Sequence, residues 1–313
     1  RSFGKPVGKN ELGGSQIHAP GSGAVDNEVE SEVEAFEQIA QFLSYLPQSV
    51  WHLPPRVNSQ DPADRKDESL LSVIPRDRRQ MYEVREVIAG IVDKDSFFEI
   101  NAGYGCSLAI GLARLDGYAV GIMSNDTKCH GGAVDAQSSE KMMRFVDLCD
   151  TFHLPVINLV DNPGFLIGIE AEEAGTVRLG SRALMACLQA TVPWVSVIIR
   201  RCYGVAGAGH GNSDGLNLRY AWPSADWGSL PIEGGVQAAY RREIEAADDP
   251  DAKRREIEAM LEQYRSPLRT AEAFGIEEVI DPRDTRPLLC DWVKLAYDLT
   301  ATQLGPKART TRP

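Results

Sequence analysis

Two periods of apolar residues divide this chain into predicted helices and strands. Between positions 26 and 46 apolar residues recur every three or four positions, which predicts an amphipathic helix with Asp26 as its N-cap. A second helix of the same kind is predicted over about 81–91. The polar, proline-rich stretch from about 50 to 75 is interpreted as a linker that crosses between two bodies. The apolar residues of the two helices are Val29, Val33, Phe36, Ile39 and Leu43, then Met81, Val84, Val87, Ile88 and Ile91.

Short apolar runs alternate with helical segments from about residue 108 onward. The first two runs flank Asp116-Gly117, a dipeptide typical of a two-residue hairpin turn. A predicted helix over 138–152 then precedes a strand at 156–160, and one over 172–190 precedes a strand at 194–199. Such repeated units predict an α/β fold whose site lies in the loops at the carboxyl ends of the strands. Residues 232–265 carry a charged helical pattern.

Charge and composition narrow the class of protein. The chain has 33 Lys and Arg against 45 Asp and Glu, a net charge of −12, so phosphate groups of nucleic acids or membrane surfaces would repel it. No apolar run approaches the roughly 20 residues that span a bilayer. We therefore expect a soluble cytoplasmic protein, or a mitochondrial matrix protein in a eukaryote. The six cysteines are scattered, which favours reduced thiols over disulfides and argues against a metal site.

Two short motifs suggest other enzyme classes but fit them poorly. The run Gly207–Gly211 follows a predicted strand, yet it lacks the third glycine of a dinucleotide-binding loop because position 212 is Asn. The run Gly211–Gly215 has the form G-x-S-x-G around Ser213. All five histidines precede Ser213 and a loop leads into it, so a plain turn is favoured over the nucleophile elbow of a serine hydrolase.

Two loops after predicted strands share one construction. Asp161-Asn-Pro-Gly164-Phe165 follows the first strand, and Arg200-Arg-Cys-Tyr-Gly-Val-Ala-Gly207 follows the second. Small residues there let a ligand approach the backbone, and amides at a helix N-terminus can hold negative charge. Two such amides could stabilise an enolate oxygen. The alternative is a pair of tight turns that need glycine for steric reasons alone, and the spacing leaves both interpretations open.

Longer stretches resemble a known family. VDLCDTFHLPVINLVDNPGFLIG, ATVPWVSVIIRRCYGVAGAG and YAWPSADWG, in this order, resemble the C-terminal half of the carboxyltransferase β subunit of biotin-dependent acyl-CoA carboxylases, of the propionyl-, acetyl- and methylcrotonyl-CoA carboxylase type. ELGGSQIHAPGSGAVDNEVE and FLSYLPQS resemble the end of the N-terminal half. The resemblance implies a ClpP/crotonase-like ββα spiral, with residues 1–60 ending the N-terminal half and adding a linker helix, and residues 61–313 forming the C-terminal crotonase-like domain.

The resemblance also implies a reaction and a site. Such subunits move a carboxyl group from N-carboxybiotin to the α-carbon of an acyl-CoA, with no metal and no side-chain acid or base. By similarity, the backbone amides of Val205 and Ala206 would form the oxyanion hole for biotin. Arg200 and Arg201 could contact CoA phosphates or the carboxylate of carboxybiotin, and a solvated strand end explains them equally well. Residues implied to line the cofactor pocket are Gly164, Phe165, Tyr203 and Gly204, and weaker candidates for substrate contact are Arg200, Arg201, Gly207 and Ala208.

The second loop departs from the common family pattern. Many propionyl- and acetyl-CoA enzymes have Gly-Gly-Ala-Tyr-Asp, whereas positions 204–208 here are Gly-Val-Ala-Gly-Ala. The valine leaves the main-chain donors in place. Loss of the tyrosine and the aspartate at 207 and 208 suggests a roomier or differently oriented acyl pocket.

The resemblance further implies partners and leaves alternatives. Lys141-Met142-Met143 is interpreted as a solvated lysine beside two core methionines rather than as a biotin attachment site, so biotin would be carried by a separate biotin carboxylase and carrier subunit. The chain would form a homo-oligomer, a dimer or a hexamer, and would be inactive without an N-terminal half. The alternatives are a biotin-dependent decarboxylase, a crotonase-type hydratase or hydrolase using Glu233, and a non-catalytic scaffold.

Overall fold

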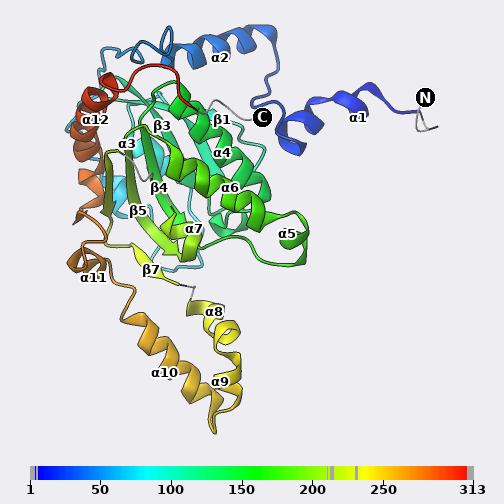
Figure 1. Ribbon diagram of the computed structural model, residues 1–313, viewed down its shortest axis with the longest axis vertical. Helices are drawn as coiled ribbons and strands as arrows, with labels where there is room; N and C mark the ends of the chain where they lie inside the picture. Colours follow the sequence, from blue (N-terminus) through cyan, green and yellow to red (C-terminus); the bar gives the residue numbers. More distant parts are fainter. Residues whose placement is uncertain (1–3, 5, 210, 212–214, 230–231, 309–313) are drawn as a thin grey trace.

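The computed structural model describes residues 4, 6–209, 211, 215–229 and 232–308 (Figure 1). The strands are β1 (Phe98–Ile100), β2 (Leu108–Leu115), β3 (Tyr118–Asn125), β4 (Val156–Asn162), β5 (Trp194–Tyr203), β6 (Asn217–Ala221), β7 (Asp226–Gly228) and β8 (Glu278–Val279). The helices are α1 (Lys9–Gly13), α2 (Glu32–Tyr45), α3 (Val84–Ile91), α4 (Ala136–Thr151), α5 (Ile169–Glu173), α6 (Thr176–Gln189), α7 (Gly204–Ala208), α8 (Ile232–Ala239), α9 (Arg241–Glu245), α10 (Pro250–Glu262), α11 (Pro267–Glu272) and α12 (Thr285–Ala301).

One sheet organises the chain, with strand order β1-β2-β3-β4-β5-β6-β8 and with β7 paired to β5. The β2–β3 hairpin turns at Asp116-Gly117, as predicted, and places Leu115 opposite Tyr118. From β3 to β6 each neighbouring pair is parallel. The α/β prediction is therefore confirmed. Because β3, β4 and β5 run in the same direction, their carboxyl ends meet at one edge of the sheet.

Helices cover both faces of this sheet (Figure 1). Helices α3 and α12 pack on one face with Ile157 and Leu159 of β4, while α4 and α6 pack on the other with Val156. A strand that is buried on both faces lacks the alternation of a half-exposed strand, and positions 156–160 are accordingly all buried, including the polar Asn158. The helix predicted over 172–190 is divided into α5 and α6 at Gly175, and the strand predicted at 194–199 continues to Tyr203.

The proline-rich segment before α3, which was interpreted as a linker, packs on this body along its length. Leu70 is buried in the core of α3 and α12. Arg65 donates to the carbonyl oxygens of Gly90 and Val92 at 3.0 and 2.8 Å. Arg286, buried on α12, donates to the backbone oxygens of Asp61 and Pro62. Arg286 thus satisfies backbone carbonyl groups of the segment, and Arg65 of the segment satisfies those at the end of α3.

The predicted helix near the N-terminus begins later than its sequence suggested. Ser31, not Asp26, is the N-cap, and its hydroxyl oxygen accepts a hydrogen bond from the Glu34 amide. Asp26 instead forms an ion pair with Arg144 of α4 at 3.2 Å. Val33, Phe36, Ile39 and Leu43 of α2 remain exposed, Phe36 by 69%, whereas Tyr45 at the end of the helix is buried.

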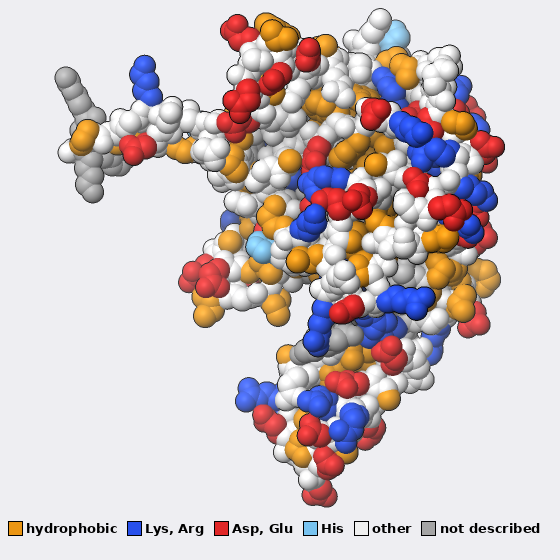
Figure 2. Space-filling model, turned by 180° about the vertical axis from the view of Figure 1, so that it is seen from behind, with side chains coloured by type: hydrophobic (Ala, Val, Ile, Leu, Met, Phe, Trp, Pro, Cys, Tyr) orange, Lys and Arg blue, Asp and Glu red, His pale blue; other side chains and the backbone are white. Residues whose placement is uncertain are grey.

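Helices α8, α9 and α10 form an arm that stands apart from the sheet (Figures 1 and 2). The arm has a small core of its own, made by Ile232, Val236, Ile244 and Ile257. The helical pattern predicted over 232–265 is confirmed for this segment, although it is divided into three helices. In the part of the chain that the structure describes, no helix is both long and apolar enough to cross a membrane.

Two cysteines overturn the expectation that all six are reduced thiols. Cys106, in the turn before β2, and Cys129, in the loop after β3, form a disulfide with their Cα atoms 5.7 Å apart. The two residues are 23 positions apart, and they meet because the β1–β2 turn and the end of β3 lie at the same edge of the sheet. The remaining cysteines, Cys149, Cys187, Cys202 and Cys290, are free and buried.

Lys141 of α4 was expected to be solvated, and this was wrong. Its side chain is buried, with 2% of the residue exposed, and its Nζ lies 3.5 Å from the carbonyl oxygen of Gly105. Desolvation lowers the pKa of its amine to about 8. Met142 and Met143 are buried, as predicted.

Replacing Lys141 with methionine is expected to raise the free energy of unfolding at pH 7 by up to roughly 3 kcal/mol. The folded pKa is about 8 against an ordinary 10.5, so between these values the unfolded chain binds more protons than the folded chain. The free energy of unfolding of the wild type therefore rises between pH 8 and pH 10.5. Below pH 8 the cost of burying the charged amine is fully present. Urea unfolding at several pH values should show that Lys141→Met is more stable than the wild type, by a difference that vanishes above pH ~10.5. The exposed Lys9→Met is the control, and a pH-independent advantage would contradict the assignment.

Candidate functional site

The site lies where β5 ends and α7 begins. Tyr203 is the last residue of β5 and the N-cap of α7. Gly204 then takes a φ of 59°, a left-handed conformation that side chains disfavour, and this bend turns the chain from the strand into the helix. A glycine is therefore required at 204 for the backbone alone, whatever ligand the loop holds.

Helix α7 is closed by a bond to its own C-cap and is anchored to β4 through one carbonyl group. The Val205 oxygen accepts from the Gly209 amide at 2.8 Å, and the Ala206 oxygen accepts from Nδ2 of Asn162 at 3.3 Å. Amides in the first turn of a helix have no acceptor within the helix. The amides of Val205 and Ala206, the two predicted donors, occupy that first turn. The valine side chain is 69% exposed and the alanine 3% exposed.

Asn162 joins the two glycine loops. Its Oδ1 accepts from the Gly164 amide at 2.8 Å, and its Nδ2 reaches Ala206 in α7. The structure thus brings together the loops that follow β4 and β5. No atom lies within 4 Å of the place that a Cβ on Gly164 would occupy, so the loop is open on that side. Phe165 instead packs against Gly180 of α6, where an added Cβ would lie only 2.4 Å from the ring.

Arg200 and Arg201 are anchored to one buried carboxylate. Nε of Arg200 donates to Oδ2 of Asp161 at 2.9 Å, and Nε of Arg201 donates to Oδ1 at 2.6 Å. Tyr82 donates its hydroxyl to the same Oδ2, and the Arg200 guanidinium lies 4.9 Å from the centre of the Tyr82 ring. Arg200 is 3% exposed, so the interpretation as a solvated strand end was wrong for it. Both arginines lie within β5 rather than in a loop.

Two cavities flank the start of α7. One of about 400 Å³ is lined by residues that include Thr127, Gly131, Pro163, Arg201 and Tyr203. The other, of about 420 Å³, is lined by residues that include Gly204, Gly207, Cys202 and Trp227. Of the predicted site residues, Arg200, Arg201 and Tyr203 line the first cavity and Gly204 and Gly207 the second, whereas Gly164, Phe165, Val205 and Ala206 line neither.

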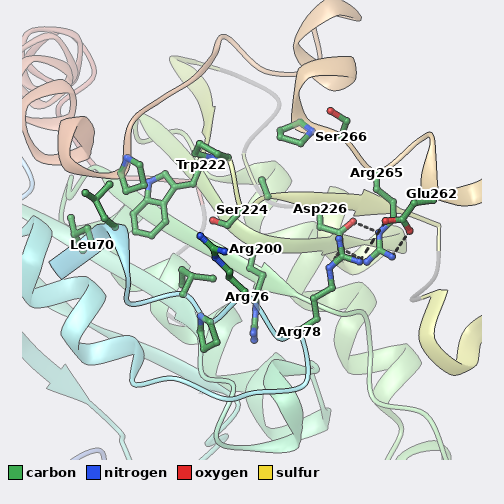
Figure 3. Close-up of a pocket in the computed structure, with 17 residues that line it drawn as sticks. Leu70, Arg76, Arg78, Arg200, Trp222, Ser224, Asp226, Glu262, Arg265 and Ser266 are labelled. Atoms are coloured by element: carbon green, nitrogen blue, oxygen red, sulfur yellow. Dashed lines mark hydrogen bonds and ion pairs between the residues drawn. The ribbon is translucent and has the colours of Figure 1, made fainter. Parts of the chain in front are cut away.

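A third cavity, of about 570 Å³, lies behind this edge (Figure 3). Asp226, Arg265 and Glu262 lie together at one end of it, and Leu70 and Trp222 lie at the other. Tyr203 donates its hydroxyl to Oδ2 of Asp226 at 2.6 Å, and Arg265 donates to both Asp226 oxygens. Burial, followed by this hydrogen bond, raises the pKa of Tyr203 above its usual value. The Tyr203 hydroxyl is therefore a neutral, fixed support for the start of α7.

Sequence reasoning missed the residues that hold the site together. Asp161 and Asn162 stood in the loop that was singled out, and Asn before Pro-Gly is a turn signal, but neither was assigned a role. Asp226 and Arg265 carried no signal, because their pairing depends on contact between distant segments. The side chains of Ala208 and Glu233, and Ser213 altogether, lie outside the described residues. Among the residues that are described, no group of three or more His, Cys, Asp or Glu is placed to hold a metal ion.

Comparison with known proteins identifies the family. Residues 2–310 match the family described as carboxyl transferase domain. The chain is 38% identical over 285 residues to the carboxyltransferase subunit of propionyl-CoA carboxylase from Haloferax mediterranei, a match that covers 90% of this chain and 55% of the relative. It is also 38% identical to the methylmalonyl-CoA carboxyltransferase 12S subunit of Propionibacterium freudenreichii, covering 99% of this chain and 58% of the relative. The chain therefore spans a little over half the length of these relatives.

Solved structures agree with this result. A transcarboxylase 12S crystal structure, described as a hexamer with methylmalonyl-coenzyme A bound, superimposes with a TM-score of 0.86 at 34% identity, covering 99% of this chain and 59% of that one. A geranyl-CoA carboxylase β subunit from P. aeruginosa has a TM-score of 0.70 at 23% identity and shares the fold. The predicted crotonase-like α/β fold is confirmed by these neighbours. The chain belongs to the carboxyl transferase domain family.

Proposed function

We propose that this chain provides the biotin side of a carboxyltransferase that moves a carboxyl group between N-carboxybiotin and the α-carbon of an acyl-CoA. Residues 61–313 would form the C-terminal carboxyltransferase domain, and residues 1–60 the end of the N-terminal half with its helix. The observation that carries the proposal is the geometry of α7, whose first-turn amides at Val205 and Ala206 have no acceptor within the helix.

The residues fit a biotin ring on three counts. The amides of α7 can donate to an anionic oxygen. The Gly164 loop is open beside them, because nothing lies within 4 Å of a Cβ built there. Cavities of about 400 and 420 Å³ flank the helix, which is the size range of small-molecule sites.

Carboxybiotin, when bound, supplies the carboxyl group and leaves negative charge on its ureido oxygen. The amides of Val205 and Ala206 would face that charge. Their positions would be fixed before the ligand binds, because the helix is closed by Gly209 and is bonded to Asn162. Asn162 would keep the Gly164 wall and α7 at a constant separation. Tyr203 would fix the start of the helix through Asp226.

The partners follow from the same proposal. Biotin would be carried by a separate biotin-carrier and biotin carboxylase subunit, and the acyl group by coenzyme A. Several relatives are named as subunits, and the transcarboxylase neighbour is a hexamer, which supports a homo-oligomer here. Further contacts to CoA would come from an N-terminal carboxyltransferase half.

A decarboxylase is the second candidate, because the chain is 34% identical over 285 residues to the α subunit of methylmalonyl-CoA decarboxylase from Veillonella parvula, covering 91% of this chain and 55% of that relative. The same amides would serve that reaction, since it transfers the carboxyl group in the opposite direction.

Exchange of a labelled carboxyl group tests the proposal. The chain, supplied together with an N-terminal carboxyltransferase half, is incubated with free biotin and a panel of labelled carboxylated acyl-CoAs. We expect label to move to biotin only when both substrates are present, with longer or branched acyl groups accepted because Gly207 borders a cavity. A strict preference for the malonyl over larger groups would contradict the roomier acyl pocket. Hydration of an enoyl-CoA with no carboxyl exchange would contradict the proposed function.

A further inference from the structure

The Cys106–Cys129 pair lies on the surface, next to the loops of the proposed biotin pocket. Cys106 is exposed and Cys129 is half-buried, so reagents in solution can reach the disulfide. Exposed disulfides are the labile ones that exchange with cellular thiols. The other cysteines differ, because burial raises the pKa of the Cys187, Cys202 and Cys290 thiols to about 12. Thiol chemistry in this chain is thus concentrated at one pair.

A short chain of contacts leads from Cys129 to the Gly164 wall. The Cys129 carbonyl oxygen accepts from the Gly132 amide at 2.9 Å and closes a tight turn. His130, Gly131 and Gly132 in this turn all have positive φ values of 48°, 63° and 86°. Glycine adopts positive φ freely and histidine more readily than most side chains, but the conformation still has a cost for histidine, so contacts with the surroundings help to fix the turn.

The residue that follows the turn pairs directly with the pocket wall. The Val134 amide donates to the Gly164 oxygen at 3.0 Å, and the Leu166 amide donates to the Val134 oxygen at 2.9 Å. Val134 and Phe165 form an isolated parallel bridge. The Gly164 loop therefore rests on the segment that Cys129 anchors.

A second contact ties the same turn to β5. Nη2 of Arg201 donates to the Gly131 oxygen at 2.6 Å, and Gly131 lines the cavity of about 400 Å³. Arg201 lies in β5, the strand that ends at α7, and its Nε donates to Asp161 of β4. The turn is therefore connected to both strands. Both walls of the site thus depend on the position of residues 129–134.

We propose that Cys106 and Cys129 are a reversible redox pair that controls the order of the 130–134 segment and, through it, the biotin pocket. On oxidation by a disulfide or peroxide, the two thiols lose two protons and two electrons and form the S–S bond, which holds the turn against the start of β2. On reduction by a dithiol, the bond breaks, both thiols regain their protons, and the turn loses this restraint while its contacts with Arg201 and Asn125 remain. The effect on biotin rests on the proposed function, whereas the effect on the loop does not.

The first test measures the loop without any ligand. Amide hydrogen exchange of the oxidised and dithiothreitol-reduced chain is compared by mass spectrometry, with thiol alkylation to count the free cysteines. We expect two additional alkylated cysteines after reduction, at 106 and 129, and faster exchange at 130–134 and 164–166. Absence of the disulfide in the oxidised chain, or unchanged exchange after its reduction, would overturn the proposal.

The second test uses linkage between the two sites. We expect reduction to weaken the binding of free biotin by about tenfold, within the usual range for coupled sites. By reciprocity, saturating biotin must then lower the midpoint potential of the pair by about 30 mV. Equal binding of biotin by the oxidised and the reduced chain would overturn the coupling. If neither form binds biotin while the exchange difference is present, the proposed function fails and the redox pair stands.

Variants separate the disulfide from other effects of the reductant. Cys106→Ser should bind biotin like the reduced protein and should no longer respond to dithiothreitol. Cys290→Ser, which removes a buried thiol of α12, is the matched control and should keep the full response. A response that persists in Cys106→Ser would overturn the proposal, and the measurements on the unaltered chain remain decisive if a variant does not fold.

Discussion

Replacing Ala206 with proline is expected to lower carboxyl exchange by about 10²–10³-fold, because it removes one of two main-chain donors at the proposed oxyanion hole. Proline in the first turn of a helix sacrifices no intrahelical hydrogen bond. The loss should appear in kcat, since the charge on the ureido oxygen develops during the reaction and is small in the bound state. Exchange kinetics with free biotin measure the effect, and circular dichroism verifies that the variant is folded.

Neighbouring variants make this result interpretable. Val205→Ala keeps the main-chain amide and changes only an exposed side chain, so its activity should match the wild type. Val205→Pro removes the adjacent donor at a position where the side chain faces solvent, so the ring meets little steric resistance. Equal activity of the wild type and both folded proline variants would remove these amides from the mechanism.

Replacing Asp161 with asparagine is expected to lower the free energy of unfolding by roughly 3–5 kcal/mol, the usual cost of leaving a buried charge without its partner. Asp161 is fully buried, and its carboxylate accepts hydrogen bonds from Nε of Arg200, Nε of Arg201 and the Tyr82 hydroxyl. Asparagine has nearly the same size, so the change removes the charge and leaves the volume. Arg200, 3% exposed, would lose the only carboxylate with which the structure pairs it among the described residues.

Urea unfolding measures this loss as a lower midpoint with an unchanged slope. The matched control is Asp251→Asn on α10, where the carboxylate is 70% exposed and pairs with Arg254 at 3.2 Å. Exposed pairs of this kind contribute about 1 kcal/mol or less. An Asp161 variant as stable as the control would show that the arginines do not need this carboxylate.

Much of the fold could be predicted because its elements are local. The apolar run at 156–160 and the turn at Asp116-Gly117 depend on neighbours within a few residues, and both were located correctly. Helix α4 was predicted from the same kind of pattern, with its methionines in the core. The start of α2 was misplaced because Asp26 and Ser31 are both good caps, and Asp26 is engaged by Arg144 and Asn101 from distant parts of the chain.

The sequence by itself determined the two glycine loops, the α/β alternation and the family, because these depend on residue types at short, ordered spacings. Tertiary structure decided the rest. It buried Lys141, joined Cys106 to Cys129 and gave Arg200 and Arg201 one shared carboxylate. These contacts join segments that are distant along the chain. Parallel strands place their carboxyl ends at one edge whatever their separation in sequence, so which side chains meet there depends on the register of the whole sheet.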